Sequence, residues 1–323
     1  MARDDEVPAG TSVAVRKRLA IGAVPALLAL GLGLAWLALS SRSELPDGLT
    51  GGVVFVSDRD GSPALYFRRL PNEPERRLTF GSEAVGEPRV SPDGSRVAFA
   101  MNGRIGVVAL ASGETSVLTL GVDWKDTQPD WLPDGRRLVV AARRRVGEPA
   151  SLHLVEPAPD GSVARRPLTQ ARGGDDQSPA ASPNGAWVAF VREDRLMRVD
   201  LDGGRLTRLT GGFKRDRSPR FLGRERLVCA WSEGKKHGID AIDLVTRARQ
   251  TLTEGGVFYR TLAPSPDGRF LAVTRSWDSG VPPFAGLLGA PKEEVRLLDA
   301  SGHERGRLFA SRRHANHSPD WGR

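Results

Sequence analysis

The chain has 323 residues, a formal net charge of +8, a pI near 10.3 and a single cysteine, Cys229. Its basic residues are scattered and are not gathered with aromatic residues, which argues against nucleic-acid binding and favours a solvated basic surface. One cysteine excludes an intramolecular disulfide, so an exported domain of this sequence must depend on its hydrophobic core. The length fits one closed all-β domain, and we expect Cys229 to be a buried, unreactive thiol.

The N-terminal part of the chain predicts a membrane anchor. Residues 1–18 form a short polar tail that ends in three basic residues, and residues 19–41 contain no charge. As a helix, about 22 apolar residues span about 33 Å, enough to cross the bilayer core. The basic flank predicts a cytoplasmic tail, a single-pass signal anchor in the inner membrane and an extracytoplasmic remainder, residues 42–323. A cleaved signal peptide, with Ala38-Leu39-Ser40 as its site, is the alternative.

A short turn motif recurs through the remainder of the chain. Its best copy is Ser91-Pro92-Asp93-Gly94, in which proline presets the first corner, aspartate bonds the turn amides and glycine takes a positive φ. The copies begin at residues 45, 91, 132, 182, 222 and 265, although the one at 222 lacks the Pro-Asp-Gly core. Each is followed by a strand-like apolar run, such as Val97 to Ala100.

The period of the repeat predicts the fold. Copies 40 to 50 residues apart, each with several short strands, are typical of β-propeller blades. In the copy that begins at 182, strands are expected over residues 186–192, 195–201 and 205–210, with the following proline segment as the fourth strand. The sequence therefore predicts a six-bladed propeller of four-stranded antiparallel blades. We expect residues 317–323 to join the first blade and close the ring, which removes exposed sheet edges.

These motifs resemble a known family of repeats. The Phe55-Val56-Ser57-Asp58 segment, the Ser-Pro-Asp-Gly turns and the run from Val199 to Gly204 that ends in Leu209-Thr210 resemble the TolB-type, WD40-like (PD40) propeller repeat over residues 45–323. The resemblance implies protein partners in the bacterial cell envelope, as in the Tol–Pal system. TolB itself is soluble and has an extra N-terminal domain, whereas the predicted anchor takes that place here.

Repeat-equivalent residues identify a candidate binding site. A proline in the segment before each turn, such as Pro88 before the turn at Ser91, is called the lead-in proline. Three residues before each lead-in proline, or before Leu262 where that proline is missing, the chain has Val85, Asp126, Asp176, Asp216, Tyr259 and Asn316. Such positions lie on a circle in a propeller, so Asp126, Asp176, Asp216 and Asn316 are expected to surround one mouth of the central channel. Oxygen ligands there would suit Ca²⁺ or a basic peptide. Alternatively, each aspartate only caps its own turn.

Sequence motifs of catalysis are missing. The chain has no Gly-x-Ser-x-Gly elbow, phosphate-binding loop or Cys/His zinc spacing. His314 and His317 form the one histidine cluster and are the candidate metal ligands, since some propeller lyases of similar fold hold a metal through channel histidines. The sequence therefore favours a non-enzymatic protein- or peptide-binding module without a catalytic site. The alternative is a metal-dependent carbohydrate lyase or hydrolase that uses the channel.

Overall fold

The computed structural model of the chain describes residues 45–120, 122–171, 173–276, 293–309 and 315–322. The predicted membrane helix over 19–41 and the candidate ligand His314 lie outside these residues. In the described part of the chain, no helix has the length and apolar character needed to span a bilayer.

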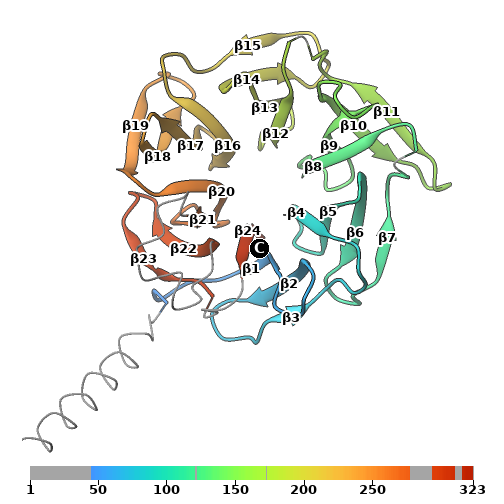
Figure 1. Cartoon of the computed structure of the whole chain (residues 1–323), viewed down its shortest axis with the longest axis horizontal. Helices are drawn as coiled ribbons and strands as arrows, with labels where there is room; N and C mark the ends of the chain where they lie inside the picture. The colour runs from blue at the N-terminus through green and yellow to red at the C-terminus, as the bar shows by residue number, and fades with distance from the viewer. Residues whose placement is uncertain (1–44, 121, 172, 277–292, 310–314, 323) are drawn as a thin grey trace, which may run out of the picture. The chain divides into compact units, whose positions relative to one another are not determined.

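The described residues form six four-stranded antiparallel sheets, which surround a common axis as the blades of a propeller (Figure 1). From the axis outward, blade 1 contains β24 (Asn316–Gly322), β1 (Gly52–Ser57), β2 (Ala64–Arg69) and β3 (Arg76–Arg77). Blade 2 contains β4 (Val85–Val90), β5 (Arg96–Met101), β6 (Arg104–Ala109) and β7 (Thr115–Val117). Blade 3 contains β8 (Lys125–Trp131), β9 (Leu138–Arg143), β10 (Ser151–Pro157) and β11 (Val163–Pro167).

The other three blades repeat this order. Blade 4 contains β12 (Asp176–Ala181), β13 (Trp187–Arg192), β14 (Arg195–Asp200) and β15 (Leu206–Arg208). Blade 5 contains β16 (Arg215–Leu222), β17 (Arg226–Glu233), β18 (Lys236–Asp243) and β19 (Arg249–Gly255). Blade 6 contains β20 (Phe258–Pro264), β21 (Phe270–Ser276), β22 (Glu293–Asp299) and β23 (Glu304–Arg307).

The predicted turns and ring closure are confirmed. The Gly94 amide donates to the Ser91 carbonyl at 2.8 Å, Gly94 has a φ of 72°, and Asp93 accepts the Ser95 amide at 3.0 Å. The C-terminal strand β24 pairs with β1 from Gly52–Gly322 to Ser57–Asn316. The ring is therefore closed by the last strand of the chain, which is the innermost strand of the first blade.

The prediction that the proline segment is the fourth strand of the preceding blade is wrong. The proline segment after residue 210 is β16, which pairs with β17 and belongs to blade 5, whereas the innermost strand of blade 4 is β12. Each lead-in segment thus pairs with the strand that follows its own turn. The pairing is local because a tight turn directly connects those two strands.

The hydrophobic core lies between neighbouring blades. The central strands are apolar on both faces, and all six residues of β1 are buried. Val54 and Val56 of blade 1 pack with Val97 and Phe99 of blade 2, and equivalent clusters join the other blades. Each sheet therefore buries both faces against its neighbours, which holds the inner strands at fixed positions around the axis.

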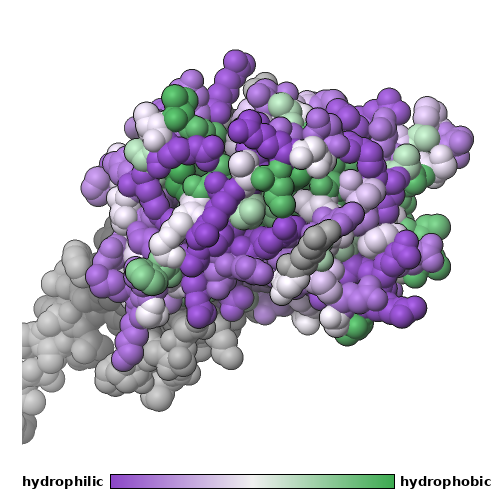
Figure 2. All heavy atoms as spheres, turned by 90° about the horizontal axis from the view of Figure 1, so that it is seen from above, coloured by the Kyte–Doolittle hydropathy of each residue, from purple (hydrophilic) through white to green (hydrophobic). Residues whose placement is uncertain are grey.

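The ring has two faces, which differ in the segments that they carry. The loop face is where the inner strands β4, β8, β12, β16, β20 and β24 begin, and it also carries the hairpin between β13 and β14. The turn face is where these strands end in the Pro-Asp-Gly turns. The side of the ring visible in Figure 2 is mostly hydrophilic, with hydrophobic side chains in small separate groups.

Candidate functional site

The predicted aspartates lie at the loop face, but their side chains are buried. Asp126, Asp176 and Asp216 stand at or next to the first residue of β8, β12 and β16, and Asn316 begins β24. The three aspartates are 0%, 0% and 1% exposed, and Asn316 is also buried. A ligand at the channel mouth would have to contact these four side chains. Their burial separates them from the solvent at that mouth.

Each buried carboxylate forms an ion pair with an arginine of its own blade. Asp126 accepts from Arg165 of β11 at 2.6 Å, and Asp176 accepts from Arg192 of β13 at 2.6 and 2.8 Å. The Asp216 carboxylate is 2.6 Å from Nη2 of Arg249 in β19. Hydrogen bonding to Asp176 raises the pKa of Arg192, so this guanidinium stays charged. The pairs neutralise the charge that the sequence predicts for the mouth.

Two of the aspartates also join adjacent blades. Thr169 follows β11, the outer strand of blade 3. Its hydroxyl donates a hydrogen bond to the Asp176 carboxylate at 2.5 Å and accepts one from the Leu152 amide at 2.9 Å. The Thr210 hydroxyl connects blade 4 to Asp216 of blade 5 in the same way, at 2.5 Å. These contacts are neither a free binding site nor a cap of the residue's own turn. They connect one blade to the next.

Asn316 and the histidines occupy different surroundings. The Asn316 side-chain oxygen accepts from Arg59 at 3.5 Å. His317 is partly buried, its Nδ1 lies 3.0 Å from the Ser318 hydroxyl, and burial lowers the pKa of its imidazole. Among the described residues, no group of three or more histidine, cysteine or acidic side chains is placed to hold a metal ion. A metal role for His314 and His317 stays a prediction, since His314 lies outside the described residues.

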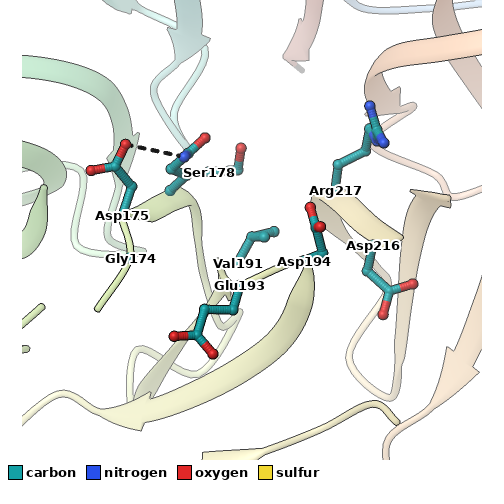
Figure 3. Close-up of a pocket in the computed structure, with 9 residues that line it drawn as sticks. Gly174, Asp175, Ser178, Val191, Glu193, Asp194, Asp216 and Arg217 are labelled. Atoms are coloured by element: carbon teal, nitrogen blue, oxygen red, sulfur yellow. Dashed lines mark hydrogen bonds between the residues drawn. The ribbon is translucent and has the colours of Figure 1, made fainter. Parts of the chain in front are cut away.

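A pocket with acidic walls opens at the loop face between blades 4 and 5. It has a volume of about 330 Å³ and is lined by residues of β12, β16 and the β13–β14 hairpin (Figure 3): Gly174, Asp175, Gln177, Ser178, Val191, Glu193, Asp194, Asp216 and Arg217. The Asp216 carboxylate points away from the other acidic residues in this view. The pocket therefore owes its acidic character to Asp175, Glu193 and Asp194.

These three carboxylates differ in how far they are engaged. Asp175 accepts the Ala150 amide at 2.7 Å and is 3.3 Å from Arg143. Asp194 lies 3.6 Å from the exposed Arg215, while no ion pair of Glu193 occurs in the described part of the chain. Glu193 and Asp194 have φ values of 49° and 59°, as a two-residue hairpin turn requires. Sequence reasoning missed them because the loops at this position differ in length and residues from blade to blade.

The comparisons with known proteins agree with this architecture. No protein-family model matches the chain. In sequence, it is 30% identical over 141 residues to a TolB homologue of Chlorobium luteolum, a match that covers 43% of this chain and 31% of that protein. The chain thus matches about a third of the length of that relative.

Solved structures extend the likeness to the whole propeller. TolB from Acinetobacter baumannii has a TM-score of 0.67 at 16% identity, over 90% of this chain and 70% of that one. An oligogalacturonate lyase in complex with manganese has a TM-score of 0.58 at 16% identity, over 79% of this chain and 73% of that one. At such identities the likeness shows the fold alone. The six closed blades and these similarities show the six-bladed β-propeller fold, and in sequence the chain is similar to a TolB homologue over part of its length.

Proposed function

We propose that this protein is a membrane-anchored, extracytoplasmic binding module that holds a protein or peptide of the bacterial cell envelope at its loop face, without catalysis. The similarity to TolB supports the envelope role. The proposed anchor is the uncharged segment 19–41, which precedes the propeller in the sequence.

The observation that carries the proposal is the distribution of exposed apolar side chains. Of eight large hydrophobic residues exposed in the described chain, five lie in loops of the loop face: Phe80, Leu120, Val122, Val146 and Phe213. Phe80 is 80% exposed and Phe213 is 87% exposed. Single exposed apolar residues are common, but their concentration on one face is typical of a surface that binds another protein.

The acidic pocket on the same face indicates the charge of the partner. Although the chain is basic overall, Asp175, Glu193 and Asp194 line this pocket, and Arg217 is the one basic residue among its lining residues. Opposite charges across an interface guide association and exclude wrong partners. We therefore expect the bound segment to combine apolar side chains with at least one lysine or arginine.

A comparative capture experiment tests this proposal. The full chain, tagged and solubilised from membranes, is used to capture envelope proteins beside two variants. The Phe80→Ser/Phe213→Ser variant should lose at least tenfold in recovery of its specific partners. The control, Val245→Ser, removes an apolar residue that is 74% exposed on the turn face and should leave recovery unchanged. Equal recovery with all three proteins would contradict the proposed face.

A further inference from the structure

A second hollow, with apolar walls, lies at the seam between blades 2 and 3. It has a volume of about 530 Å³ and is lined by the connection from β7 to β8 on the loop face and by β11 with the turn before it. Three of the eight large hydrophobic residues exposed in the described chain line it: Val117, Leu120 and Val122. Exposed apolar side chains gathered around one hollow are typical of a binding site. It is called the seam hollow below.

Trp124 forms a fixed wall of the seam hollow. Its indole ring packs against the buried His153, with the two ring centroids 4.4 Å apart. The guanidinium groups of Arg144 and Arg165 lie 4.8 and 5.3 Å from the indole centroid. These contacts hold the indole in place before any ligand arrives, which lowers the entropic cost of binding.

The polar part of the seam hollow is the ion pair of Asp126 and Arg165, both of which line it. Oδ2 of Asp126 accepts a hydrogen bond from Nη2 of Arg165 at 2.6 Å. The other carboxylate oxygen, Oδ1, and the other terminal nitrogen, Nη1, are buried and have no hydrogen-bond partner among the described residues. Asp176 differs, because both of its oxygens accept hydrogen bonds from Arg192.

The two unpaired atoms define the chemistry that fits the seam hollow. Buried polar atoms in proteins normally have partners, so a ligand in this hollow should supply one acceptor and one donor. A phenol hydroxyl supplies both from a single oxygen, since it can donate to Oδ1 of Asp126 and accept from Nη1 of Arg165. The phenol ring is apolar and suits the walls at Trp124 and Val122. A carboxylate suits the site less well, because it cannot donate to Oδ1.

We propose that the seam hollow binds the phenol side chain of a tyrosine, with the hydroxyl at Asp126 and Arg165 and the ring between the apolar walls. The tyrosine belongs to the envelope partner, and this part of the inference rests on the proposed function. Tyrosine is enriched among the residues that dominate the binding energy of protein interfaces.

A series of three ligands tests the chemistry of the seam hollow by calorimetry with the solubilised full chain. The probe is N-acetyl-L-tyrosinamide. N-acetyl-L-phenylalaninamide lacks the hydroxyl, and the O-methyl ether of the probe keeps the oxygen but cannot donate. The probe should bind about tenfold more tightly than either analogue, because each analogue leaves a buried polar atom unpaired. Equal binding of the three ligands, or no binding of the probe, would overturn the proposal.

Three variants locate the site. Leu120→Ser/Val122→Ser removes two exposed apolar side chains of the hollow and should weaken binding of the probe about tenfold. Phe213→Ser, at an exposed residue of the loop face outside the hollow, should leave binding unchanged. Arg165→Lys keeps a positive charge beside Asp126 but loses the planar fork, so it should abolish the preference for the tyrosine ligand over the phenylalanine ligand. A preference retained by folded Arg165→Lys, or unchanged binding by Leu120→Ser/Val122→Ser, would refute this site.

The capture experiment separates this inference from the proposed function. Leu120→Ser/Val122→Ser should lower recovery of the envelope partner. If recovery falls with Phe80→Ser/Phe213→Ser but not with this variant, the loop face stands as the interface and the tyrosine does not belong to the partner. If neither variant lowers recovery, the proposed face is contradicted, whereas a measured preference for N-acetyl-L-tyrosinamide would still support the seam hollow as a phenol site.

Discussion

Replacement of Asp176 by asparagine separates a structural role from the binding role that the sequence predicts. The Asp176 carboxylate is fully buried, receives two hydrogen bonds from Arg192 at 2.6 and 2.8 Å, and accepts the Thr169 hydroxyl of the preceding blade. Asp176→Asn removes the charge but keeps the size of the side chain. The change leaves the Arg192 guanidinium without its counter-ion.

The expected loss of stability follows from this geometry. Removal of one partner from a buried ion pair costs about 3–5 kcal/mol, and Arg192, whose side chain is 14% exposed, keeps some contact with water. We therefore take the lower end, about 3 kcal/mol. Weakening of the Thr169 hydrogen bond adds about 0.5–1.5 kcal/mol. The total, about 4 kcal/mol, is a large part of the 5–15 kcal/mol that is usual for a folded domain.

Urea unfolding of the full chain, followed by fluorescence, measures this loss. Glu193→Gln is the matched control: it also neutralises a carboxylate of blade 4 at the loop face, but its residue is exposed, so we expect a change within about 0.5 kcal/mol. Suppose instead that Asp176→Asn costs less than about 1 kcal/mol and abolishes partner binding. That result would make the Asp176 carboxylate a ligand for the partner and would refute its structural role.

Two further predictions concern ring closure and pH. Deletion of residues 316–323 removes the inner strand of blade 1 and the Asp320 carboxylate that accepts a hydrogen bond from the Val90 amide. Thermal unfolding should therefore begin at a much lower temperature. An unchanged unfolding temperature would contradict closure of the ring by β24. Because the folded-state pKa of Asp130 is raised to about 7, its contribution to stability is present below about pH 4 and is lost as the pH rises through 7. Asp130→Asn should therefore gain stability relative to wild type between pH 5 and pH 8, by about 1–3 kcal/mol, and a constant difference in urea unfolding would refute the shift.

The local features of the candidate site could be read from the sequence only in part. The repeat correctly places Asp126, Asp176 and Asp216 at equivalent starts of inner strands. It gives no sign of their partners, because the arginines lie 39, 16 and 33 residues further along, with no common spacing. The acidic pair Glu193 and Asp194 was missed for a related reason: a repeat reveals what its copies share, and the equivalent two-residue hairpins of blades 2 and 5 carry Asn102-Gly103 and Gly234-Lys235 instead.

The sequence by itself determined the number of blades, the turns and the closure of the ring, because tight turns and short-range strand pairing depend on neighbouring residues. Only the tertiary structure decided which way the inner-strand side chains face. Each inner strand has a register shift near its lead-in segment, and in five blades a residue with positive φ immediately precedes the proline, as Ser178 does. An extra residue in a strand changes the face to which the following side chains point. The aspartates predicted to surround the channel mouth are instead buried within the blades, where each pairs with an arginine.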